Sequence, residues 1–214
     1  MALHSVPLLL ADELFLLAHD DVSGRPRLQP RATGLGLAGA LLGELLLFGS
    51  ITTREGTVVV LNLAPPADAL AHRILDHITR EQQRHPVRTW LAFFAQHAAD
   101  HVAERLERTN VVTRVNSRRP WAGPRWPPTD MNVGFAPLFR LRTQLFLHEP
   151  LTTDDIILVG LCTAAGLANL LLLDSPPHTR QYLDYVISTL DPAARELIAH
   201  TRAAVDNAVL THRM

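Results

Sequence analysis

The densest group of side chains suited to binding lies between residues 114 and 126, where the chain reads RVNSRRPWAGPRW. This stretch holds four arginines and two of the three tryptophans. Guanidinium groups bind phosphate oxygens, and indole rings favour the headgroup layer of a bilayer. We therefore expect a basic, aromatic loop that contacts anionic lipid through Arg118, Arg119, Trp121, Arg125 and Trp126. The alternatives are an oligomer or partner interface, or a loop in which Arg and Trp stack on one another.

Basic residues elsewhere could extend this patch. The formal net charge is −1, so binding to an anionic partner must come from a local group of cations and not from the overall charge. Further candidates for a phosphate-binding group are Arg25, Arg27, Arg31 and Arg105. The chain has no lysine, and this bias is typical of a GC-rich, bacterial coding sequence.

The sequence contains no convincing motif for metal binding or catalysis. His97 and His101 would share a helix face, but no third ligand follows at a recognisable spacing, so we expect solvated histidines, no metal and no cofactor. There is no Gly-x-Ser-x-Gly elbow and no P-loop, and we predict no enzymatic activity. The single cysteine, Cys162, excludes an internal disulfide and is expected to be buried.

The elements that would position these residues are mainly helices. Apolar periodicity and capping residues predict helices over 8–18, 34–48 (with Thr33 as N-cap), 87–94, 98–109, 137–148, 153–173, 179–190 and from 191 onward. Asp68 is expected to cap a further amphipathic helix in which Leu70, Ile74, His77 and Ile78 share a face. Turn residues Arg54-Glu55-Gly56 predict a tight hairpin between 51–53 and 57–61, and 111–115 reads as a strand. A helix from 34 to 48 with only Glu44 as a charged side chain does not suit DNA, and we predict no nucleic-acid binding.

The segment 156–173 has no charged residue across 18 positions. It is long enough to span a membrane, but acidic residues flank it and no aromatic belt accompanies it. We expect it to be the central buried helix of one compact domain over 1–214, mainly α, with one or two small β-hairpins.

Four stretches in order along the chain resemble the Golgi phosphoprotein 3 family. They read LLLADELFLLAHDDVSGR, GLAGALLGELLLFGSI before the hairpin, HVAERLERTNVV, and FRLRTQLF before the apolar segment. The resemblance implies a helical peripheral membrane protein that recognises phosphatidylinositol 4-phosphate. It also implies that the 116–130 loop is a hairpin used in oligomer contacts and membrane engagement.

The residues that hold the phosphoinositide in that family do not match here. The resemblance places its tryptophan at Gln29, one arginine at Ala38 and two later arginines at Asp100 and Ala103. A phosphomonoester needs cationic and N–H donors, and Asp100 would repel it. Either the phosphate site is rebuilt from Arg25, Arg27, Arg31 and Arg105, or this chain binds something other than that headgroup. We favour the second and predict binding of another anionic lipid at the membrane surface.

The sequence thus predicts a non-enzymatic, cytoplasmic protein that binds anionic membrane lipid weakly and in a salt-sensitive way. A homo-oligomer is a further expectation. The N-terminal stretch carries Asp12 and Glu13 and no basic region, so it does not read as a signal peptide. The alternative function is a soluble oligomeric adaptor that binds a protein partner through the 116–130 loop.

Overall fold

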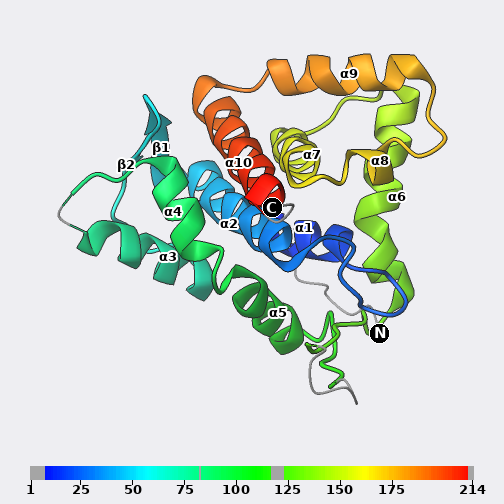
Figure 1. Ribbon diagram of the computed structural model, residues 1–214, viewed down its shortest axis with the longest axis horizontal. Helices are drawn as coiled ribbons and strands as arrows, with labels where there is room; N and C mark the ends of the chain where they lie inside the picture. The colour runs from blue at the N-terminus through cyan, green and yellow to red at the C-terminus, as the bar shows by residue number, and fades with distance from the viewer. Residues whose placement is uncertain (1–7, 82, 117–122, 212–214) are drawn as a thin grey trace.

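The computed structural model describes residues 8–81, 83–116 and 123–211. The described residues form ten helices and one two-stranded antiparallel hairpin (Figure 1), and the protein is mainly α as predicted. In chain order the elements are α1 (Leu10–Ala18), α2 (Pro30–Leu47), β1 (Ile51–Arg54), β2 (Thr57–Val60), α3 (Ala69–Arg80), α4 (Val87–Phe94), α5 (Ala98–Arg108), α6 (Met131–Leu147), α7 (Thr153–Ala165), α8 (Ala168–Leu171), α9 (Pro177–Ser188) and α10 (Pro192–Thr211).

Helix α2 is at the centre of the molecule. It packs against α1, α4, α5, α7 and α10, and 14 of its 18 residues are buried. Figure 1 shows α3, α4 and α5 on one side of it and α6, α8 and α9 around the other. A helix whose side chains are apolar on every face is stable only when other elements surround it, and this composition places α2 inside.

The apolar segment 156–173 is buried for the most part, but it is not one helix. Helix α7 ends at Gly166, which has a φ of 99° and adopts the left-handed conformation that glycine accepts most readily. The chain then begins the short helix α8 at Ala168. Within the described parts of the chain, no helix combines the length and the apolar character that crossing a bilayer requires.

Several helix ends follow the predicted capping chemistry. The Asp68 carboxylate accepts hydrogen bonds from the N–H groups of Leu70 and Ala71 at the start of α3, and Asp191 does the same for α10 ahead of Pro192. Gly49 has a φ of 66° just beyond α2, as predicted.

Two predicted helix starts are wrong by more than two residues, and both errors involve proline. Helix α2 begins at Pro30 and not after Thr33, because proline fits the first helical turn; the Thr33 hydroxyl donates to the Gln29 carbonyl instead. Helix α6 begins at Met131, capped by the Asp130 carboxylate, and continues through Pro137. The proline therefore lies inside α6 and does not begin it.

The predicted hairpin is confirmed. Strands β1 and β2 pair from Ile51↔Val60 to Arg54↔Thr57, and positive φ values at Glu55 and Gly56 form the two-residue turn between them. The predicted strand 111–115 is not part of a sheet, because only Val112 and Val115 form isolated bridges. These bridges lie in the connection between α5 and α6, which carries most of the candidate binding residues.

Candidate functional site

The connection between α5 and α6 is a two-sided arm, described over 111–116 and 123–130 and hereafter called the α5–α6 arm. Its sides are joined by reciprocal N–H···O bonds of 2.9 Å between Val115 and Arg125, and by a 3.0 Å bond from the Thr113 N–H to the Pro127 carbonyl. The arm lies beyond the end of α5, at the lower edge of the molecule in Figure 1. Of the predicted lipid-contacting residues, Arg118, Arg119 and Trp121 lie outside the described residues.

Trp126 does not point outward from the arm as its pattern suggested. Only 8% of its surface is exposed, and it belongs to the apolar core together with Val112. The guanidinium carbon of Arg114 lies 5.7 Å from the centre of its ring, at cation–π distance. The indole therefore anchors the base of the arm, and the expectation that Trp126 contacts lipid is corrected.

A turn over 20–26 packs against this base. The Asp20 side chain accepts from the N–H and hydroxyl of Ser23, at 2.8 and 2.7 Å, and Gly24 takes a φ of 63°. The Trp126 N–H then donates to the Gly24 carbonyl at 3.2 Å. The segment with Arg25 and the segment with Arg125, predicted separately from the sequence, therefore adjoin in the structure.

The remaining candidate arginines have different surroundings. Arg27 lies beside two carboxylates, at 2.9 Å from Asp21 and 3.7 Å from Asp20, and its Nε donates to the His19 carbonyl. Its charge is thus already neutralised. Arg31 is exposed on the first turn of α2.

Arg105 is not a surface residue. Its guanidinium lies at 2.8 Å from Asp12 and from Glu44 and at 3.0 Å from Asp68, and only 5% of the residue is exposed. We call these four residues the Arg105 cluster. It connects α1, α2, α5 and the N-cap of α3. The prediction that Arg105 binds phosphate is corrected, because its donors are already used by three carboxylates.

The electrostatics of the Arg105 cluster reflect its burial. Burial raises the pKa of the Glu44 and Asp12 carboxyls above their ordinary values, and Arg105 opposes this only in part. Burial also acts to lower the pKa of Arg105, but the hydrogen bonds and charges of its carboxylate partners outweigh it and the pKa is raised. The guanidinium is therefore charged at every physiological pH, and its role is structural.

A second, partly buried ion-pair group holds α6 to the body. The Arg140 guanidinium donates to both carboxylate oxygens of Glu13, at 3.0 and 2.7 Å, and to Asp155 at 2.7 Å. These bonds link α6 to α1 and α7. They fix the rotation of α6 about its axis, which determines the side chains it presents to solvent.

On α5, His97 is exposed and His101 is half-buried, and Cys162 is buried as predicted. The His97 and His101 rings lie 5.8 Å apart between centres, and no group of three or more potential metal ligands occurs within 8–81, 83–116 or 123–211. Cys162 is fully buried, and burial raises the pKa of its thiol well above the usual range. The thiol is therefore neutral and enclosed.

His19, next to the 20–26 turn, makes the stability of the folded protein depend on pH. Its ring stacks on Phe15 at 4.0 Å between centres, Nδ1 lies 2.7 Å from the Phe15 carbonyl, and burial lowers the pKa below its ordinary 6.5. A lowered pKa means that the folded protein binds this proton less readily than the unfolded chain. The contribution of His19 to stability is therefore complete above pH 6.5 and decreases as the pH falls through the folded-state pKa.

We accordingly expect the unfolding free energy of the wild type to fall between pH 7 and pH 5 more than that of His19→Gln. Urea unfolding at a series of pH values measures both slopes. Equal slopes would show that His19 does not titrate in a buried, neutral form.

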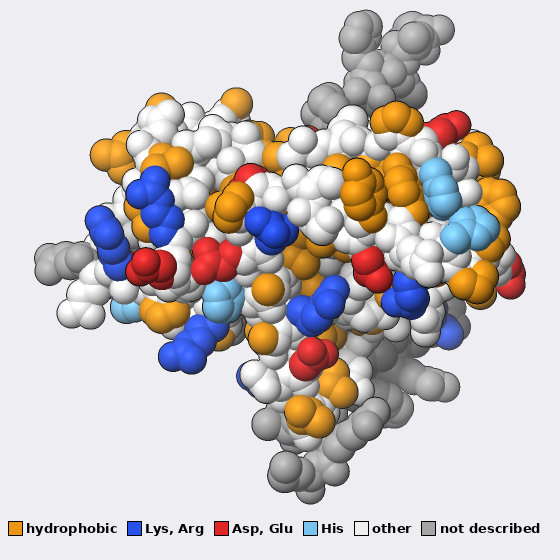
Figure 2. All heavy atoms as spheres, turned by 90° about the horizontal axis from the view of Figure 1, so that it is seen from above, with side chains coloured by type: hydrophobic (Ala, Val, Ile, Leu, Met, Phe, Trp, Pro, Cys, Tyr) orange, Lys and Arg blue, Asp and Glu red, His pale blue; other side chains and the backbone are white. Residues whose placement is uncertain are grey.

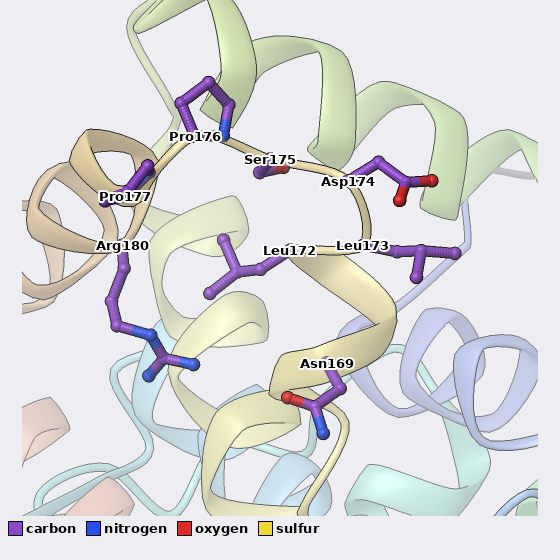
Figure 3. Close-up of a pocket in the computed structure, with 8 residues that line it drawn as sticks. All are labelled: Asn169, Leu172, Leu173, Asp174, Ser175, Pro176, Pro177 and Arg180. Carbon is purple, nitrogen blue, oxygen red and sulfur yellow. The ribbon is translucent and has the colours of Figure 1, made fainter.

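The surface also has shallow hollows. One of 430 Å³ lies between α8 and the start of α9, shown in Figure 3 and lined by Asn169, Leu172, Leu173, Asp174, Ser175, Pro176, Pro177 and Arg180. Leu172 points toward Arg180, whereas Leu173 points the other way. One cation and one anion in this hollow give it no charge preference for a phosphate group.

The positions that the family resemblance aligned with phosphoinositide-binding residues do not form a pocket. Ala38 and Ala103 are fully buried in the core, and Gln29 and Asp100 are exposed. Among these four residues there is no cation, and two of them have no access to a ligand. The packing therefore agrees with the mismatch seen in the sequence.

Comparison with protein-family models identifies the family of this chain. The model of the Golgi phosphoprotein 3 (GPP34) family matches residues 10–209, which is nearly the whole chain. The chain belongs to the Golgi phosphoprotein 3 family, whose members are known as non-enzymatic lipid-binding proteins. None of the curated proteins matches it.

Proposed function

We propose that this protein is a peripheral membrane protein that binds anionic phospholipid through the α5–α6 arm and the adjoining 20–26 turn. Membership of a lipid-binding family supports the class of function. The proposed position of the binding site rests on the backbone contact between Gly24 and Trp126. This contact brings the segments of Arg25, Arg114 and Arg125 next to one another.

The charges of these three arginines are available to a ligand. Arg25 and Arg114 are exposed and Arg125 is half-buried, and none of the three forms an ion pair with a carboxylate of the described residues. Arg27, Arg105 and Arg140 are neutralised, by contrast. A basic side chain near an anionic membrane contributes about 1 kcal/mol, so the group supplies useful but salt-sensitive attraction.

Apolar side chains accompany the cations. Val22 in the turn is 62% exposed and Val115 in the arm is 44% exposed. Such side chains gain free energy when they leave water for the lipid headgroup boundary. The buried Trp126 holds the arm in place, and the arm presents the arginines and valines together.

The proposed site senses surface charge and not one particular headgroup. With Ala38 and Ala103 enclosed in the core, the positions that the resemblance aligned with the phosphoinositide-binding arginines offer no donor to a phosphate. Vesicles containing phosphatidylserine and vesicles containing phosphatidylinositol 4-phosphate should therefore bind equally well when their surface charge is matched. The alternative of a protein–protein adaptor that uses the 116–130 loop has one contact residue fewer, because Trp126 is buried.

The test is vesicle co-sedimentation of a triple variant, Arg25→Gln, Arg114→Gln and Arg125→Gln. At about 1 kcal/mol for each arginine, we expect an affinity for phosphatidylserine vesicles roughly 100-fold below that of the wild type. The matched control is Arg88→Gln, Arg195→Gln and Arg202→Gln, which removes the same charge from exposed positions on α4 and α10. Equal losses in the two variants would mean that overall charge and not the arm binds the membrane, and unchanged binding in both would refute the proposal.

A further inference from the structure

Helix α6 has a buried apolar face and, beside it, an exposed apolar face, although it lies at the edge of the molecule. Its inner face buries Leu138, Leu141 and Leu145 against the body. Its exposed apolar residues, which we call the outer face of α6, are Met131, Phe135, Phe139, Phe146 and Leu147. Figure 1 shows α6 at the edge of the molecule, with α8 and the connection to α9 beside its upper part. An exposed apolar face of this size indicates a missing partner.

The spacing on the outer face is that of a helix-pairing seam. Phe135, Phe139, Arg142 and Phe146 follow one another at intervals of four, three and four residues. These intervals average about 3.7 residues, close to the 3.6 residues of one helical turn, and keep the four side chains in one stripe along the helix. Arg142 lies in the middle of this stripe, and its guanidinium donates to the Leu173 carbonyl at 2.6 Å.

The outer face is held in place before any partner arrives. The ion pairs of Arg140 with Glu13 and Asp155 fix the helix, and the Phe135 and Phe139 rings lie 6.1 Å apart. Beside them an apolar groove of 380 Å³ extends to Leu173, which is itself about half exposed. A surface that is already ordered loses little conformational entropy on binding.

The exposed area agrees with what a dimer needs. The outer face and Leu173 together expose six large side chains, each by roughly half of the about 200 Å² that such a residue offers, which gives on the order of 600 Å². A stable interface buries about 800 Å² on each partner, with polar atoms at its rim. The patch is therefore large enough to form the apolar centre of such an interface.

We propose that the outer face of α6 binds the same face of a second copy of this chain, with the two helices antiparallel about a twofold axis near Phe139. In a parallel pair each Arg142 would face its own counterpart, and two like charges would meet in an apolar interface. In the antiparallel pair Phe139 meets its counterpart, and Met131 lies opposite Leu147 of the second copy. Arg142 is then about three residues from the axis and is separated from its counterpart.

The surrounding charges favour a second copy over a bilayer. Arg142 and Asp174 both line the groove, and Asp130 and Glu149 lie at the two ends of α6. An anionic membrane would be repelled by these carboxylates and would find one arginine whose guanidinium already has a partner. Figure 2, which looks onto α9 and the C-terminal end of α6, shows mixed charges and apolar side chains gathered at the α6 edge.

The first test is the mass of the intact protein in solution. We expect light scattering at about 100 μM protein to give twice the 23.7 kDa of one chain. Phe139→Asp, which acts on both sides of a twofold interface, should weaken association by at least about 100-fold. Tyr185→Asp is the control, because it makes the same change at an exposed aromatic residue on α9. A monomeric wild type would overturn the proposal, and if its vesicle binding also fell with Phe139→Asp, the face would be assigned to the bilayer.

The second test locates the axis by disulfide formation. The native Cys162 is fully buried, so an introduced cysteine supplies an accessible thiol. Phe139→Cys should form a covalent dimer on mild oxidation, because two helices packed about 8–10 Å apart bring facing Cα atoms within disulfide range. Met131→Cys should not, because eight residues on either side of the axis separate the two thiols by about 24 Å. Cross-linking through Met131→Cys and not through Phe139→Cys would refute the antiparallel arrangement.

Discussion

Arg105→Met is expected to lower the unfolding free energy by about 3–5 kcal/mol, the largest effect of any single substitution considered for this protein. The side chain it replaces is 5% exposed and binds Asp12, Glu44 and Asp68 at 2.8–3.0 Å. Methionine fills similar space but leaves three carboxylates without a counter-charge. Urea unfolding followed by circular dichroism measures the loss.

Two further variants separate this cause from general damage to α5. Arg108→Met changes an exposed arginine one turn along the same helix and should alter the unfolding free energy by no more than about 0.5 kcal/mol. Adding Asp12→Asn and Glu44→Gln to Arg105→Met removes the unpaired charges and should recover part of the stability. A loss from Arg105→Met as small as that from Arg108→Met would show that the Arg105 cluster does not hold the helices together.

Gly24→Ala is expected to detach the α5–α6 arm from the 20–26 turn. Gly24 has a φ of 63°, and a Cβ atom there would collide with the backbone of Trp126 and Pro127. The left-handed conformation costs about 1 kcal/mol for alanine, and the displacement of the arm adds about 1–3 kcal/mol. Indole fluorescence should report exposure of Trp126, and vesicle binding should fall because the arginines no longer adjoin.

Gly49→Ala provides a matched control for this effect. Gly49 has a φ of 66°, almost the same as Gly24, but no atom lies within 4 Å of the position of its added Cβ. Gly49→Ala therefore has the conformational cost of about 1 kcal/mol, but its Cβ atom collides with no neighbouring backbone. If Gly24→Ala and Gly49→Ala behaved alike in stability and in vesicle binding, the contact between turn and arm would have no role.

Much of the helical architecture was predictable because it depends on residues close in the chain. The caps at Asp68 and Asp191, the turn at Glu55-Gly56 and the end of α2 at Gly49 are all local signals, and they are confirmed. The two wrong helix starts come from prolines, whose effect depends on position: Pro30 begins a helix and Pro137 lies inside one.

The Arg105 cluster was not predictable, because its partners are distant in sequence. Asp12, Glu44 and Asp68 precede Arg105 by 93, 61 and 37 residues, and no short-range pattern connects them. One signal was present in the sequence: Glu44 is the only acid in a helix that is otherwise apolar. A buried carboxylate of this kind needs a cation, and an arginine on a neighbouring helix was the natural candidate.

The outer face of α6 could not be recognised from the sequence, because the predicted helix start at Pro137 is six residues too late. A helix that began at Pro137 left Met131 and Phe135 in a loop and broke the line that continues through Phe139 and Phe146. Trp126 was misassigned for a different reason. Its neighbours in the sequence are arginines and prolines, whereas its neighbours in space are core residues.

The measurement that tests the central claim most directly is co-sedimentation of the intact protein with vesicles of two compositions at two salt concentrations. The proposed function predicts binding to phosphatidylserine-containing vesicles at about 50 mM salt and a marked loss of binding at about 300 mM, where the screening length is shorter. It also predicts little binding to vesicles of phosphatidylcholine alone. Equal binding to both compositions, or no binding to the anionic vesicles at low salt, would contradict it.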